Sequence, residues 1–104
     1  MSKYILVYKT KSDWANLSKE QIVKMMEAWG EWLGSMGSAV VDKGDAFKAG
    51  GKEVSAQGIS DTDNHTTGYT LIEARDFDQA LGLAKGSPSI AGGGSVEVYE
   101  AFGM

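Results

Sequence analysis

Few side chains in this sequence could serve as a base, a nucleophile or a metal ligand. The chain holds one histidine and no cysteine, which excludes disulfides, thiolate metal sites and thiol nucleophiles. The histidine, His65, lies two residues after Asp63, and such a pair can act as a general base or bind a metal. Because a metal site needs several converging ligands, we favour an exposed loop imidazole and expect no metal and no cofactor.

A second polar candidate is the pair of carboxylates around Lys43 and Gly44. Asp42 and Asp45 flank this dipeptide at the end of a stretch that we expect to form a strand. Asp45 can therefore lie at the rim of a space beside the preceding helix and anchor a ligand or act in catalysis. The simpler interpretation is a turn residue that caps Gly44.

Aromatic side chains could form the apolar wall of a small-molecule cavity. Trp29 and Trp32 share one expected helix, and Phe47 follows the next strand. Ligand pockets are mostly apolar with a few polar groups, so the candidate ligand-binding residues are Trp29, Trp32, Asp45 and Phe47. Core packing explains the tryptophans equally well, because apolar residues recur along this helix at the helical period.

The glycine run at 92–94 does not predict a phosphate-binding loop. Such a loop requires a helix directly after it, whereas residues 95–102 carry the apolar alternation of a strand. No serine stands in an arrangement with a histidine and an acid, so nucleophilic catalysis has no support.

The elements that must position these residues follow from local patterns. Ser18 with Gln21 forms a capping box before the first helix, and Asp76 with Gln79 forms a second one. The first helix ends at Gly37, and its apolar stripe comprises Ile22, Met26, Trp29, Leu33 and Met36, widened by Met25 and Trp32. Strands are expected over 3–9, 38–42, 52–57, 67–74 and 95–102, with loops over 58–66 and 89–94.

This order predicts an α+β fold with an antiparallel sheet, in a ferredoxin-like βαβββαβ arrangement with one additional strand. The strands at 4–8 and 67–74 are apolar on both faces. Helices can cover only one face of the sheet, so the other face needs a second cover. We therefore predict a homodimer with a large apolar interface.

Composition narrows the function classes. With 104 residues, the chain is expected to form one domain over 1–104. A net charge of −4 argues against nucleic acid as a partner, because phosphate binding favours a basic surface. No stretch resembles a signal peptide or a membrane span, so we expect a cytoplasmic protein without membrane association.

The chain also resembles the YCII-related (DGPF-domain) family. The resemblance rests on the segments 3–8 (KYILVY), 17–20 (LSKE), 67–74 (TGYTLIEA), 77–81 (FDQAL) and 93–99 (GGSVEVY). It implies a dimeric α+β barrel, in which two ferredoxin-like sheets pack face to face. It also implies that an acidic residue near Asp45 lines the cleft between sheet and helix. The family's helix histidine corresponds here to Trp29, and the DGPF tetrapeptide is absent from 58–64.

Two functions from different classes remain open. The first is a small-molecule binding module, a homodimer that holds an apolar or aromatic ligand between the first helix and the sheet. The second is a cofactor-independent enzyme of the dimeric α+β barrel type, an isomerase, a dehalogenase or an oxygenase-like protein. An enzyme needs a base within reach of the substrate, and Asp45 and His65 are the candidates. A domain that serves only protein interaction is a third possibility.

Overall fold

The computed structural model describes residues 1–10, 17–48, 50–62 and 65–103. The elements in chain order are β1 (Ser2–Lys9), α1 (Lys19–Met36), the short 3-10 helix η2 (Gly37–Ala39), β2 (Val40–Ala46), β3 (Lys52–Ser55), β4 (Gly58–Asp61), β5 (Thr66–Ala74), α2 (Phe77–Ala84), α3 (Pro88–Ala91) and β6 (Ser95–Glu100).

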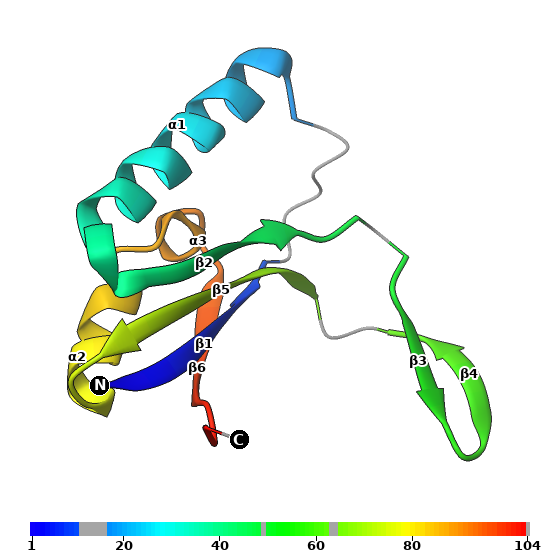
Figure 1. Ribbon diagram of the computed structural model, residues 1–104. Coiled ribbons are helices and arrows are strands. Elements are labelled where there is room, and N and C mark those ends of the chain that lie inside the picture. Colours follow the sequence, from blue (N-terminus) through cyan, green and yellow to red (C-terminus); the bar gives the residue numbers. More distant parts are fainter. Residues whose placement is uncertain (11–16, 49, 63–64, 104) are drawn as a thin grey trace.

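Four strands form one antiparallel sheet in the order β2-β5-β1-β6. Helices α1, α2 and α3 lie on one side of this sheet (Figure 1). The predicted α+β class with an antiparallel sheet is thereby confirmed, and the arrangement is compatible with a ferredoxin-like fold. Strand β1 is central, because it pairs with β5 along one edge and with β6 along the other.

Side-chain alternation along the strands separates the two faces of the sheet. On β1, Tyr4, Leu6 and Tyr8 are at most 4% exposed, whereas Ile5 and Val7 point to the opposite face. On β5 the buried residues that face the helices are Gly68, Thr70, Ile72 and Ala74. The core therefore lies between the helices and the face of the sheet that carries Tyr4, Leu6 and Tyr8. The apolar residues Ile5 and Val7 lie on the face without helices.

Helix α1 begins at the predicted capping box. The Gln21 N–H donates to the Ser18 hydroxyl at 3.2 Å, and the Ser18 N–H donates to Gln21 Oε1 at 2.9 Å. The expected stripe holds in part: Trp32 and Met36 are buried, and Trp29 and Leu33 pack against the core. Met26 departs from it and is 66% exposed. Tertiary contacts set the angle at which α1 lies on the sheet, and this angle leaves Met26 outside the core.

Strand β2 is irregular, and Gly44 is the reason. The register against β5 shifts twice between Val40 and Asp45. Gly44 has a φ of 73°, and a Cβ at this position would lie 1.8 Å from the Tyr69 carbonyl oxygen. The Gly44 N–H donates to Asp42 Oδ1 at 2.9 Å, which holds the turn. Only glycine fits this close approach of two strands.

Two elements replace predicted loops. Residues 58–61, expected within a loop, form β4 and pair with β3 in a separate two-stranded sheet. This β3–β4 hairpin projects away from the main sheet (Figure 1). Residues 89–91, also expected within a loop, belong to the short helix α3, which has Ser87 as its N-cap. The loop over 58–66 was expected because it lacks an apolar run, yet backbone pairing between strands needs none.

Candidate functional site

Three aromatic rings form a cluster between β1 and α1, which includes two of the predicted ligand-binding residues. The ring centroids of Tyr8 and Trp29 lie 4.6 Å apart, and those of Trp29 and Trp32 lie 5.6 Å apart, both in edge-to-face contact. The Tyr8 and Trp32 centroids are 6.0 Å apart. The alternation of β1 and the spacing of α1 bring the three rings together on the helix side of the sheet.

The two tryptophans differ in their freedom to contact a ligand. Trp32 is 8% exposed, and its indole N–H donates to the Leu83 carbonyl oxygen at 3.2 Å. Trp32 also lies close to Gly86, where a Cβ would come within 3.0 Å of the indole nitrogen. These contacts make Trp32 a core residue that joins α1 to the end of α2. Trp29 is only partly buried and packs at the edge of the core.

A polar chain runs through the apolar layer behind these rings. The Tyr8 hydroxyl donates to Thr70 Oγ1 at 2.6 Å, and the Thr70 hydroxyl donates to the Lys43 carbonyl oxygen at 2.9 Å. Burial raises the pKa of Tyr8 to about 12, and the hydrogen bond to Thr70 opposes this shift. The Tyr8 hydroxyl is therefore a neutral group at physiological pH.

Sequence reasoning missed this Tyr8–Thr70 pair. The alternation of residues 4–8 already places Tyr8 on one face together with Tyr4 and Leu6. A buried tyrosine hydroxyl normally finds a partner, so a search for a hydroxyl on a neighbouring strand could have found Thr70. The pairing of β1 with β5 was needed to identify it.

Asp45 is an exposed residue near the end of β2, where it lies opposite Tyr69 in the register. Its carboxylate accepts a hydrogen bond from the adjacent Ala46 N–H at 2.8 Å. This is the contact of a residue that shapes the local backbone. The predicted cap of Gly44 is not Asp45 but Asp42, which accepts the Gly44 N–H.

Phe47 lies apart from the two tryptophans, so one wall containing all three rings does not form within this chain. Its ring stacks on Tyr69, with centroids 6.1 Å apart. Tyr69 pairs with Val7 and alternates with the buried Gly68 and Thr70, so it points away from the helices. The reason is the pleat, which places neighbouring residues of β5 on opposite faces of the sheet.

His65 is exposed and has a φ of 57°, a left-handed conformation that histidine adopts more readily than most residues. Its carbonyl oxygen accepts a hydrogen bond from the Thr10 N–H at 3.1 Å. The carboxylate of the expected pair, Asp63, lies outside the described residues together with Asn64. Among the residues that the structure describes, no group of three or more histidines or acids could hold a metal.

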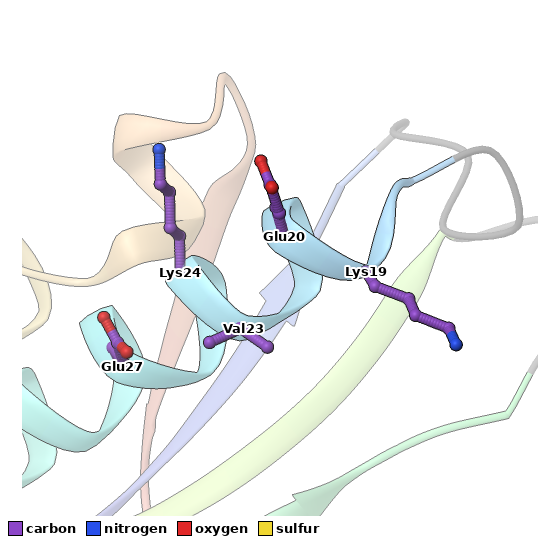
Figure 2. A pocket seen from close by; sticks show the side chains of 5 residues that line it. All are labelled: Lys19, Glu20, Val23, Lys24 and Glu27. Atoms are coloured by element: carbon purple, nitrogen blue, oxygen red, sulfur yellow. The ribbon is translucent and has the colours of Figure 1, made fainter.

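A shallow depression lies on the outer surface of α1 and is lined by Lys19, Glu20, Val23, Lys24 and Glu27. Figure 2 shows these side chains pointing in different directions from a single helix, with both charge signs interspersed. Because the polar groups do not converge on one point, the depression has the character of a solvated helix face.

Comparison with known proteins adds no assignment: no protein-family model matches the chain, and no curated protein matches it. Within the described part of the chain, none of the helices has the length and apolar character that crossing a membrane requires.

Proposed function

We propose that this protein is a homodimeric module that binds a small apolar or aromatic molecule between α1 and the sheet, beside Trp29. The observation that carries the proposal is the partial burial of Trp29 within the aromatic cluster. Trp29 is held in place by Tyr8 and Trp32, yet part of its surface remains free. A rigid ring that is only partly covered can contact a second ring at little entropic cost.

The flank of α1 next to Trp29 supports this proposal. Met26 lies three residues before Trp29, about 60° away around the helix, and is 66% exposed. Val23 lies further around the helix, beside Glu20 and Glu27 at the depression on the outer surface. An apolar ligand that enters from this flank would cover Met26 together with the free edge of Trp29.

Titration with Nile red, a neutral aromatic dye, tests this ligand site. We expect saturable fluorescence enhancement that is lost in Met26→Glu, because the new carboxylate would have to be buried by the dye. Leu81→Glu is the matched control, because Leu81 is an exposed apolar residue on a different helix. Equal dye binding by both variants would refute the site.

The second part of the proposal is the homodimer. Ile5, Val7, Tyr69, Leu71 and Tyr99 share the sheet face that points away from the helices, and we call this set the open face. Tyr69 and Tyr99 are 37% and 51% exposed within one chain. We propose that the open faces of two copies pack together, as in the dimeric α+β barrel that the resemblance to the YCII-related family implies.

The total surface of the chain supports this association. One chain exposes 7469 Å², whereas a compact monomer of 11.1 kDa exposes about 5,700 Å². The excess is of the order that each partner loses in a stable dimer, about 800 Å² or more. Sedimentation equilibrium should give twice the chain mass at micromolar concentration.

A pair of variants assigns the interface. Ile5→Lys places a charge on the open face directly opposite Leu71 and Tyr99 and should yield a folded monomer, because burying an ammonium group among apolar side chains is unfavourable. Leu81→Lys adds the same charge on α2 and should leave the dimer intact. A dimer that survives Ile5→Lys would refute packing through the open face.

A further inference from the structure

The β3–β4 hairpin has no packing partner of its own within the chain. In the described residues its two strands contact each other extensively, whereas no other element shares more than a few contacts with them. All eight residues of the two strands are exposed. Figure 1 shows the hairpin extending away from the main sheet, beyond the ends of β2 and β5. An isolated two-stranded hairpin is at best marginally stable in water.

One face of this hairpin is apolar at its centre. Val54 and Ile59 lie directly opposite each other in the register and are 76% and 72% exposed. The neighbouring pair on the same face, Lys52 and Asp61, forms an ion pair. The face is therefore uncharged as a whole, with an aliphatic pair beside a neutralised pair. The opposite face carries the polar residues Glu53, Ser55 and Ser60.

The end of β2, from which the chain leads to the hairpin, adjoins the open face. Phe47 directly follows β2, on the path to β3, and stacks on Tyr69 of the open face. The Phe47 N–H donates to the Thr67 carbonyl oxygen at 2.8 Å, which ties this residue to β5. Apolar surface thus continues from the sheet toward the hairpin instead of ending at the sheet edge.

We propose that the β3–β4 hairpin is an arm that packs its Val54–Ile59 face on the second copy of this chain, an inference that rests on the proposed homodimer. The arm face, whose charges form an ion pair, matches a largely apolar counterpart. The open face with its Phe47–Tyr69 extension is a surface of that kind on the same chain, with a second ion pair, Lys9–Glu97, beside Val7. In a two-fold dimer each copy supplies one arm and receives one. A nucleic acid or an anionic membrane would need a basic face, which the arm lacks.

The overall dimensions agree with an arm that completes its packing outside its own chain. The radius of gyration is 14.7 Å, whereas a compact domain of this length has about 13 Å. The molecule measures 42 × 37 × 19 Å, so it is thin in one direction and long in the others. The area that a stable dimer needs is thus available on the open face together with the arm.

Two variants on neighbouring residues of β4 test the arm. Ile59→Asp places a carboxylate on the apolar face, and Ser60→Asp places the same charge on the opposite face. We expect Ile59→Asp to raise the dimer dissociation constant by about tenfold or more, because each dimer buries two copies of this residue. Ser60→Asp should leave the constant nearly unchanged. Equal dissociation constants for both variants would overturn the arm.

A direct distance measurement separates the arm from the dimer itself. Because the chain has no cysteine, a nitroxide on Ser60→Cys labels the arm alone, on the face that does not pack. The spin-labelled chain, without nitrogen-15, is mixed with an unlabelled chain enriched in nitrogen-15. In mixed dimers the nitroxide should broaden the amide signals of the enriched partner copy. A dimer in sedimentation without such broadening would refute the arm and leave the dimer standing. A monomer at all concentrations would refute both.

Discussion

Tyr8 carries a hydroxyl group into the apolar layer between β1 and α1, where Thr70 satisfies it. The pair joins two central strands at residues 62 positions apart in sequence, and Thr70 extends the chain of bonds to β2. A satisfied polar pair in a core costs little, whereas a lone buried hydroxyl would destabilise the fold. The same burial holds the Tyr8 pKa above its ordinary value.

The raised pKa makes stability depend on alkaline pH. In the unfolded chain Tyr8 loses its proton near pH 10.0, whereas the native residue keeps it until about 12. Between these values the unfolded state binds fewer protons, so the free energy of unfolding falls as pH rises. Below pH 10.0 both states are protonated and Tyr8 adds no pH dependence.

We expect the free energy of unfolding of Tyr8→Phe to fall by about 1–3 kcal/mol less than that of the unsubstituted protein as the pH rises through this range. Urea denaturation at several pH values between 9 and 12, for both proteins, measures it. At neutral pH the variant should lose only about 0.5–1.5 kcal/mol, because the Thr70 hydroxyl keeps the Lys43 carbonyl oxygen as partner. Parallel pH profiles of the two proteins would contradict the assignment.

The two tryptophans should separate stability from ligand binding. Trp32→Ala removes a buried ring and its indole donor to the Leu83 carbonyl oxygen, which keeps the Gly86 N–H, so we expect a loss of about 3–5 kcal/mol. Trp29→Ala should cost less, about 1–3 kcal/mol, because part of its ring is already in water. Nile red binding should nevertheless fall most in Trp29→Ala. Denaturation and dye titration on the same samples measure both effects. If Trp29 served packing alone, Trp29→Ala would lose no more dye binding than Trp32→Ala.

Among the elements, β2 and α1 use glycine for opposite reasons. Gly44 allows β2 to approach the Tyr69 carbonyl oxygen in a left-handed conformation. Gly34 in α1 has no atom within 4 Å of where a Cβ would stand, so its missing side chain serves no close contact there.

One substitution at the two glycines should therefore change stability in opposite directions. Gly44→Ala should destabilise by about 1–3 kcal/mol through backbone strain and displacement of β5. Gly34→Ala should stabilise by up to about 1 kcal/mol, because alanine favours the helix and the site is open. Urea midpoints at one fixed protein concentration measure both effects, and a stable Gly44→Ala variant would exclude the tight approach of β2 to β5.

At the scale of the whole molecule, folding and association should be coupled. The open face of the sheet lies outside the helix layer, so the proposed dimer would stabilise each copy by mass action. We expect the melting temperature to fall by several degrees upon roughly hundredfold dilution. Ile5→Lys should abolish this concentration dependence, and a melting temperature that is independent of concentration in the unsubstituted protein would argue against the dimer.

The local elements of this fold follow from the sequence because their causes lie within a few residues. The Ser18–Gln21 box starts α1 where it is expected, and the alternation of residues 4–8 assigns Tyr4, Leu6 and Tyr8 to one face. The glycines at 92–94 precede a strand, as predicted. The need for glycine at 94 comes from tertiary structure, because a Cβ there would meet the Lys9 carbonyl oxygen at 2.3 Å. Strand β4 escapes such reasoning, because its polar residues pair through the backbone alone.

The sequence by itself thus determined the fold class, the two-faced strands and the helix that carries Trp29 and Trp32. Tertiary structure alone decided that Met26 lies outside the core-facing side of α1. It also decided that Phe47 stacks on Tyr69 instead of on the tryptophans, and that Thr70 is the partner of Tyr8. These outcomes depend on pairings between strands far apart in the chain, whose register sets the face of every side chain. No pattern within a few residues contains that register.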